Sequence, residues 1–360
     1  MKVTLVNHPH RPLIDSGRGI DRYCYYLSNG LPNKNILVKN INAIDSNNMF
    51  IRNYFSVPLK LVELSGESSD IYHSVAPDGA QLALLLNKSP LVTNIHDVIP
   101  FYDSTNKRGH LKDLYGKMYT KMVLNTINKS QRLIVPFNYT KNWLLENLFI
   151  DDSKISVINY GVEIKKHNEK KVGSEETLSN IKNYFIFIGG GRPILRGLPI
   201  VLKAFSYAMR DIEDYLLISL QKNFGTLSQY ELAIKMIGRY NLGARVKIVN
   251  FIPELSLPHV LRNARALLFP STMGFSFLEL QAMMVGTPVI TTNCYDNVEF
   301  IQNSGIICPI NDINCFSKAI VLISTNKDFY SLKSNESLKR SKSFSVSRML
   351  DSTIQLYESL

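Results

Sequence analysis

The sequence lacks the long apolar runs and the cysteine patterns that mark several protein classes. No segment approaches the roughly 18–20 consecutive apolar residues of a membrane-spanning helix. The opening MKVTLVNHPHRP is predicted to form a short strand and has no apolar signal-peptide core. The four cysteines, Cys24, Cys294, Cys308 and Cys315, form no C-x-x-C pair, which suggests neither a zinc site nor a disulfide framework. We therefore expect a reduced, cytoplasmic setting.

Acidic residues are scarce relative to basic ones. The chain has 41 Lys and Arg against 30 Asp and Glu, a net charge of +11. The excess is strongest in the basic segment 104–145, where eight Lys and Arg accompany Asp113 alone, a local charge of +7. Such a cluster suits an anionic lipid surface, nucleic acid or a phosphorylated substrate. A solvated helix face would give the same pattern.

The length of 360 residues exceeds what one hydrophobic core usually serves, so we expect two domains. Short β-rich runs alternate with helical periodicity, which is typical of parallel α/β sheets. The polar segment 163–183 interrupts this alternation and is the predicted linker between domains 1–162 and 184–342. The predicted strands are Val3–Val6, Val92–Ile95, Leu133–Val135, Ile155–Ile158, Tyr184–Ile188, Tyr215–Ser219, Val246–Val249, Ala266–Phe269 and Val289–Thr291.

Two loops of the first domain could carry chemistry, because ligands of such sheets bind beyond the carboxyl ends of the strands. Gly17 and Gly19 precede an amphipathic helix and would let backbone N–H groups approach a phosphate or sugar. Their spacing matches neither a dinucleotide fingerprint nor a P-loop, and a plain surface loop is the alternative. His96 follows an apolar strand and could donate a hydrogen bond to a substrate, although a lone histidine is more often structural.

Two loops of the second domain give stronger signals. Gly189, Gly190 and Gly191 follow a strand, and Arg192 and Arg196 come before the next helix. Glycine-rich backbone, a helix N-terminus and two guanidinium groups suit a diphosphate. The alternative is a surface loop with two solvated arginines.

The second of these loops is PSTMGFSFLELQAMMVGTPVI, residues 270–290. Ser271 and the backbone of 274–276 lead into a helix and offer donors to an anion. Met273 and Phe275 are expected mainly to pack. Glu279 and Gln281 lie two apart on the helix and cannot face one ligand side by side.

Taken in order, these segments resemble the retaining GT-B-fold glycosyltransferases of the large family-4 group. The resemblance covers nearly the whole chain, and seven motifs in the right order make it specific. The matching segments are GRGIDRYCYYLSNGL (17–31), IHDVIPF (95–101), VPFNYTKNWL (135–144), ISVINYGVE (155–163), IGGGRPILRGLPIVLKAF (188–205), PSTMGFSFLELQAMMVGTPVI (270–290) and FSVSRMLDSTIQLYESL (344–360).

The resemblance implies two Rossmann-like doubly wound domains that face each other across a cleft. The first domain would bind the acceptor, the second would bind a nucleotide sugar, and helix 343–360 would cross back to the first. The implied reaction is metal-independent and cofactor-free transfer of a sugar from a nucleoside diphosphate sugar to an acceptor hydroxyl, with retention. Catalytic roles fall on His96, Arg192 and Arg196, and donor binding on Gly17, Gly19, Gly189, Gly190, Gly191, Ser271, Met273, Gly274, Phe275, Ser276 and Gln281.

The chain departs from the family pattern at its two signature glutamates, which fall on Met273 and Gln281. Methionine accepts no useful hydrogen bond from a sugar hydroxyl. Glutamine keeps hydrogen-bonding capacity toward a ribose but loses the charge assistance, about 1.5–3 kcal/mol. An active enzyme with altered donor recognition is the main hypothesis, and a catalytically impaired nucleotide- or glycan-binding protein is the alternative.

The basic segment 104–145 contains Leu111, Leu114, Tyr115, Met118 and Met122 on one predicted helical stripe, with two lysines on the other side. No recognised nucleic-acid module accompanies it, so no specific nucleic-acid partner is expected. Since the family often takes lipid-linked acceptors, we expect peripheral contact with an anionic membrane.

Overall fold

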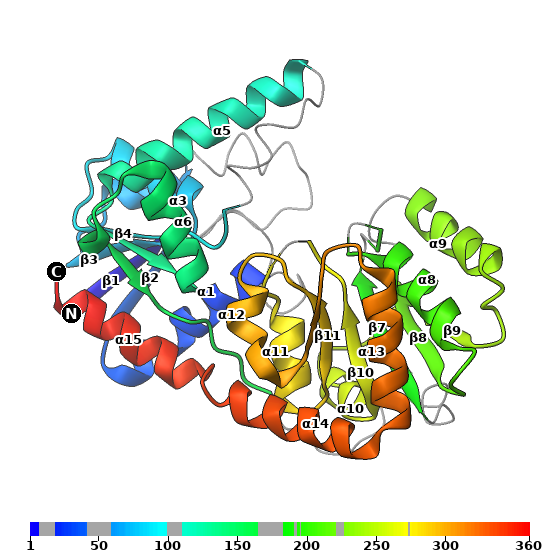
Figure 1. Cartoon of the computed structure of the whole chain (residues 1–360). Coiled ribbons are helices and arrows are strands. Elements are labelled where there is room, and N and C mark those ends of the chain that lie inside the picture. The colour runs from blue at the N-terminus through cyan, green and yellow to red at the C-terminus, as the bar shows by residue number, and fades with distance from the viewer. Residues whose placement is uncertain are drawn as a thin grey trace. The chain divides into compact units, whose positions relative to one another are not determined.

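The computed structural model describes residues 1–6, 19–41, 59–98, 110–164, 183–190, 193–194, 196–220, 227–272 and 274–360. Its contacts divide the chain into two compact units (Figure 1). Unit 1 comprises Met1–Gly161 and Ser345–Leu360, and unit 2 comprises Val162–Phe344. Most of the expected linker, 165–182, lies outside the described residues.

Unit 1 contains a six-stranded sheet, sheet A, with the order β2-β1-β3-β4-β5-β6. All neighbouring strands pair in parallel. Parallel sheets are covered on both faces, which is why β3 and β4 are buried at every residue. The strands are β1 (Lys2–Val6), β2 (Leu37–Ile41), β3 (Ile71–Ser74), β4 (Leu91–Asn94), β5 (Arg132–Val135) and β6 (Ile155–Val157).

The helices of unit 1 cover this sheet (Figure 1). They are α1 (Gly19–Gly30), α3 (Pro77–Leu85), α5 (His110–Lys129), α6 (Asn138–Leu148) and α15 (Val346–Glu358), with short turns η1 (Pro32–Lys34) and η3 (Asp152–Lys154). Helices α5 and α6 pack through Val123, Ile127 and Leu144 onto β5 and β6. Helix α15 packs beside α1, and its first turn lies so close to Gly161 that a Cβ there would be 2.4 Å from the Val346 nitrogen.

Unit 2 contains sheet B, again with parallel pairs throughout, in the order β12-β11-β10-β7-β8-β9. This is the doubly wound Rossmann order, with the first strand in the middle. The strands are β7 (Tyr184–Gly190), β8 (Tyr215–Leu220), β9 (Val246–Val249), β10 (Ala264–Phe269), β11 (Val289–Thr292) and β12 (Ile306–Cys308).

Helices also cover sheet B. One apolar core joins α8, α9 and α13 to the sheet, while α11 contacts α10 and α14 (Figure 1). The helices are α8 (Leu198–Ala208), α9 (Leu227–Arg239), α10 (Leu257–Arg262), α11 (Phe277–Met284), α12 (Asn297–Ile301), α13 (Ile313–Thr325) and α14 (Lys327–Ser341), with a turn η4 (Gln302–Ser304). None of the described helices is long and apolar enough to cross a membrane.

Two expectations from the sequence are wrong in detail. Cys308 and Cys315 form a disulfide, because the turn between β12 and α13 brings two cysteines seven positions apart into contact. Met118, expected on the buried stripe of α5, is 65% exposed. Among the described side chains of α5, Val123 and Ile127 are buried and pack into the core of unit 1.

Candidate active site

The two strongest candidate loops meet at one edge of sheet B. Strands β7 and β10 are neighbours, and the chain leaves them toward opposite sides of the sheet, so the loops that follow them flank the switch point. Gly197 makes their contact possible. Its φ is +86°, and a Cβ at this position would lie 2.5 Å from the Pro270 carbonyl oxygen. Only glycine permits this approach.

Arg196 is placed by this contact. It directly precedes Gly197, its side chain is half-buried, and its charge lowers the pKa of Glu279 in α11. The guanidinium therefore acts on the first turn of the helix that follows β10. A cation and a helix N-terminus that act on the same place favour an anionic ligand.

The turn before α11 has a fixed geometry. Gly274 adopts φ +71°, a left-handed conformation that favours glycine. Ser276 then caps the helix: its hydroxyl accepts the Leu278 N–H at 3.2 Å. In return, the Ser276 N–H donates to Oε2 of Glu279 at 3.1 Å, which completes a capping box. Ser271 is buried, and its carbonyl accepts the Thr292 hydroxyl at 2.5 Å.

Glu279 is fully buried, and its environment is unusual for a carboxyl group. Burial raises its pKa from 4.5 to about 8, although Thr291, the Ser276 N–H and Arg196 each act to lower it. Its Oε1 has no hydrogen-bond partner among the described residues, and neither does Oδ1 of the buried Asn297. No functional role is predicted for Glu279 from the sequence. The Ser276-x-x-Glu279 spacing is a capping-box signature and could have identified it.

Gln281 lies in the same helix and is only 3% exposed. No hydrogen bond joins its side chain to another described residue. A buried amide in this state has donor and acceptor capacity that a ligand hydroxyl can use.

The other predicted residues of this edge are described in part. Gly189 and Gly190 form the end of β7, where Gly190 has φ +55°. Phe275 packs against Phe277 and Phe300 with ring centroids 5.3 and 4.8 Å apart, as expected for a packing residue. The predicted residues Gly17, Gly191, Arg192 and Met273 lie outside the described residues.

In unit 1, Gly19 begins α1 and His96 follows β4. Both ring nitrogens of His96 are engaged: Nε2 lies 2.5 Å from the Val75 carbonyl oxygen, and Nδ1 lies 2.6 Å from the Tyr160 hydroxyl. Because a carbonyl only accepts, Nε2 carries the proton and Nδ1 accepts from Tyr160. His96 must therefore exchange one of these partners to reach a substrate.

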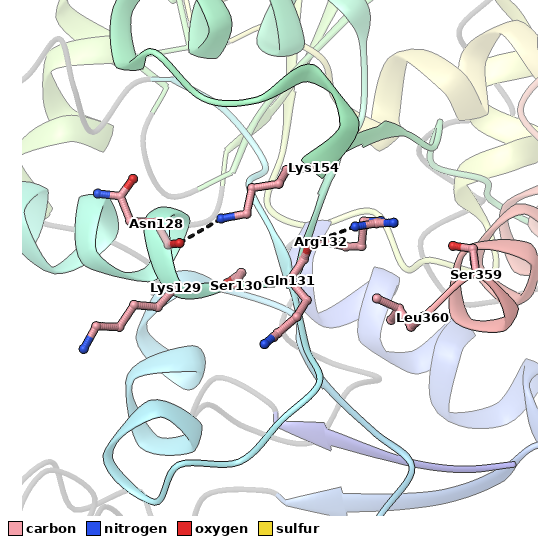
Figure 2. A pocket seen from close by; sticks show the side chains of 8 residues that line it. All are labelled: Asn128, Lys129, Ser130, Gln131, Arg132, Lys154, Ser359 and Leu360. Atoms are coloured by element: carbon pink, nitrogen blue, oxygen red, sulfur yellow. Dashed lines mark hydrogen bonds between the residues drawn. The ribbon is translucent and has the colours of Figure 1, made fainter.

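A cavity of about 510 Å³ lies elsewhere in unit 1 (Figure 2). Its lining residues are Asn128, Lys129, Ser130, Gln131, Arg132, Lys154, Ser359 and Leu360. It sits where β5 and β6 begin, whereas ligands of such sheets bind where the strands end. One of its basic residues, Lys154, already donates a hydrogen bond from Nζ to the Asn128 carbonyl at 2.8 Å. We do not assign the active site to this cavity.

Comparisons with known proteins define the class. The fold is similar to sucrose-phosphate synthase from Thermosynechococcus elongatus (TM-score 0.80, 16% identity, 99% of this chain and 98% of that chain). It is also similar to HepE from Anabaena, whose structure was determined in complex with UDP-glucose (TM-score 0.76, 16% identity, all of both chains). Two Rossmann-like units of this kind are the GT-B fold of glycosyltransferases.

The sequence comparisons give the family. Residues 182–326 match the model described as "Glycosyl transferases group 1", and residues 40–166 match "Glycosyltransferase Family 4". A relative from Escherichia coli, 26% identical over 82% of this chain and 76% of its own length, is the UDP-Gal:alpha-D-GlcNAc-diphosphoundecaprenol alpha-1,3-galactosyltransferase. The chain is a sugar-nucleotide-dependent glycosyltransferase of the group 1 and family 4 type.

Proposed function

We propose that the protein transfers a sugar, with retention and without a metal, from a nucleoside diphosphate sugar to a hydroxyl of a glycan or lipid-linked acceptor. The observation that carries the donor site is the meeting of the β7 and β10 loops at Gly197 and Pro270, with Arg196 beside the start of α11. The acceptor class is inferred from the Escherichia coli relative, whose name specifies a lipid-linked diphosphate.

In this proposal the leaving nucleoside diphosphate is stabilised by fixed positive charge. Arg196 and the N-terminal end of α11 act on the diphosphate as negative charge develops on it, and Arg192 supplies a second cation. Because both cations are guanidinium groups, they need no proton transfer to neutralise the charge. Gln281 hydrogen-bonds the nucleotide ribose, and Met273 faces the transferred sugar. His96 contacts the sugar after it exchanges one of its present partners.

A panel of UDP-, GDP- and dTDP-sugars tests the activity. We expect nucleoside diphosphate release with at least one donor when a glycan or lipid-linked acceptor is present, and a product with the donor's anomeric configuration by NMR. Activity that survives exhaustive chelation supports the metal-independent part. Nucleotide binding without turnover on any acceptor would favour the non-catalytic alternative, which the comparisons do not favour.

Contact with an anionic membrane is the second part of the proposal. Lys117 and Lys121 lie one turn apart on α5, and the exposed Met118 lies on an adjacent side of the same turn. A basic helix surface with an exposed apolar side chain suits the headgroup region of a bilayer.

Co-sedimentation with vesicles tests this surface. We expect binding to vesicles with anionic lipid, and about a tenfold loss or more when K117E and K121E are combined. The matched control combines K235E and K339E, two exposed lysines of unit 2, and should bind vesicles like the wild type. Equal loss in both double variants would show that net charge, not α5, controls the binding.

A further inference from the structure

The carboxyl group of Glu279 is built into the turn that leads to the donor site. Its Oε2 accepts the Ser276 N–H at 3.1 Å, and Ser276 closes the turn that begins at Gly274. Gly274 in turn packs against the loop after β11, where a Cβ on it would lie 3.5 Å from Tyr295 and 3.7 Å from Asp296. A change in Glu279 therefore acts directly on the Ser276 end of the 274–276 turn.

The surroundings of Glu279 contain more hydrogen-bond acceptors than protons. The Thr291 hydroxyl has one proton for two acceptors, the Phe269 carbonyl at 3.0 Å and the carboxyl group of Glu279. The same oxygen accepts Nδ2 of Asn297, also at 3.0 Å. Oε1 of Glu279 and Oδ1 of Asn297 both remain without a partner beside it. One proton on Glu279 supplies a further donor, because a protonated carboxyl group can donate to the Thr291 oxygen.

The charges that face Glu279 come from two other loops. Arg196, in the loop after β7, favours the ionised carboxylate. Asp296, in the loop after β11, lies beside Gly274 and acts on Cys294. Cys294 faces Glu279 from that loop, and burial raises the pKa of this thiol to about 11, so it is uncharged at neutral pH. Since burial outweighs Arg196, the carboxyl group keeps its proton until the pH reaches about 8.

We propose that Glu279 is a positioning residue of the donor site, which holds the 274–276 turn as a neutral carboxylic acid and weakens donor diphosphate binding when it loses its proton. An ionised Glu279 would place a negative charge under the first turn of α11 and beside Arg196, the two features that attract the diphosphate. When Glu279 is neutral, the positive potential of Arg196 and of the α11 N-terminus is not reduced and remains available to the diphosphate. This inference rests on the proposed donor site.

Calorimetric titration with UDP and GDP across pH tests the linkage. Between about pH 7 and about pH 9, either side of the pKa of about 8, we expect the wild-type affinity for the nucleotide that binds to fall about five- to tenfold. E279Q keeps an acceptor for the Ser276 N–H and a donor in place of the acid proton, so its affinity should be pH-independent and close to that of the wild type at pH 7. The control E231Q, on the exposed side of α9, should fall with pH like the wild type.

Infrared spectroscopy separates this inference from the donor site itself, because it needs no ligand. We expect a protonated-carboxyl band at neutral pH that is absent in E279Q and disappears from the wild type as the pH rises through about 8. Nucleotide binding without this band, or with the same pH dependence in wild type and E279Q, would overturn the role of Glu279 and leave the proposed function intact. Failure to bind either nucleotide would contradict the donor site, and the role of Glu279 with it, even where the band is present.

Discussion

His73 in unit 1 and Glu279 in unit 2 are both fully buried titratable side chains, but their hydrogen bonding differs. In unit 1, both nitrogens of His73 are satisfied: Nδ1 lies 2.5 Å from the Tyr357 hydroxyl, and Nε2 lies 2.6 Å from Oδ1 of Asn94. In unit 2, Glu279 has one oxygen bonded to a backbone N–H and one without a partner among the described residues. The first network joins α15 to sheet A. The second retains unused hydrogen-bonding capacity beside the turn that leads into α11. A satisfied buried network stabilises, and an unsatisfied one costs stability.

The two groups also give unit 1 and unit 2 opposite responses to pH. Burial lowers the pKa of His73 from 6.5 to about 4, so the unfolded chain binds the proton more tightly and stability is lost as the pH falls from 6.5 toward 4. Burial raises the pKa of Glu279 to about 8, so the folded chain binds the proton more tightly and stability is lost as the pH rises from 4.5 through 8.

The largest predicted effect is on the stability of unit 2. Between about pH 5 and about pH 9 the ionisation of Glu279 should lower the free energy of unfolding by roughly 4 kcal/mol. In E279Q this loss should be absent. Urea denaturation followed by circular dichroism measures the free energy of unfolding of the wild type and of E279Q across this pH range. An equal pH dependence in the two proteins would show that ionisation of Glu279 does not cause the loss of stability.

Arg196→Ala should abolish most catalysis. Removing a fixed cation from a developing diphosphate charge lowers kcat/KM by roughly 100- to 1000-fold. The change in melting temperature should be small because the side chain is half-buried. Steady-state kinetics with the best donor measures this effect, and Arg239→Ala, an exposed arginine of α9, is the control. A decrease in kcat/KM of less than tenfold would show that Arg196 does not bind the diphosphate.

Tyr357→Phe tests the satisfied network of unit 1. It leaves Nδ1 of the buried His73 without a donor and should lower the free energy of unfolding by about 1–3 kcal/mol. kcat/KM should stay within about twofold of the wild type, because this network holds the fold and not the donor. The chain's single tryptophan, Trp143, lies in unit 1 and reports its unfolding by fluorescence.

The control for this variant is Tyr330→Phe in unit 2, whose hydroxyl makes no hydrogen bond to a described residue. It should leave the Trp143 transition unchanged. If the Tyr357→Phe protein has the stability of the wild type but a lower kcat/KM, the network serves the reaction and not the fold.

Gln281→Ala should give the smallest of these effects and the reverse pattern. Loss of hydrogen bonds to the ribose should raise the KM for the donor about tenfold, the equivalent of about 1.4 kcal/mol. The free energy of unfolding should not fall through loss of a hydrogen bond, because the Gln281 side chain makes no hydrogen bond to another described residue. An unchanged KM would place the ribose elsewhere.

Much of the fold could be predicted from the sequence because the buried strands are near-continuous apolar runs. All nine predicted strands are present, with ends shifted by at most two residues. The three that were missed, β2, β3 and β12, are short or mixed in polarity: β3 is IYHS and contains the buried His73. Periodicity cannot indicate a buried histidine whose partners, Asn94 and Tyr357, lie far away in the chain.

The site could be predicted as a set of loops but not as a set of contacts. The glycines and Arg196 were recognisable because the diphosphate chemistry needs these residue types. The role of Glu279 depends on burial and on Thr291 and Asn297, which come from other elements. The disulfide between Cys308 and Cys315 depends on the turn between β12 and α13. Their spacing of seven residues matches no sequence pattern that indicates a disulfide.

A structure determined with a bound nucleoside diphosphate sugar tests the central claim most directly. We predict the diphosphate within hydrogen-bond distance of Arg196 and the first turn of α11, with the ribose on Gln281. A nucleotide bound instead in the cavity between Lys129, Arg132 and Lys154 of unit 1, or at any site that leaves Arg196 and Gln281 untouched, would contradict the assignment.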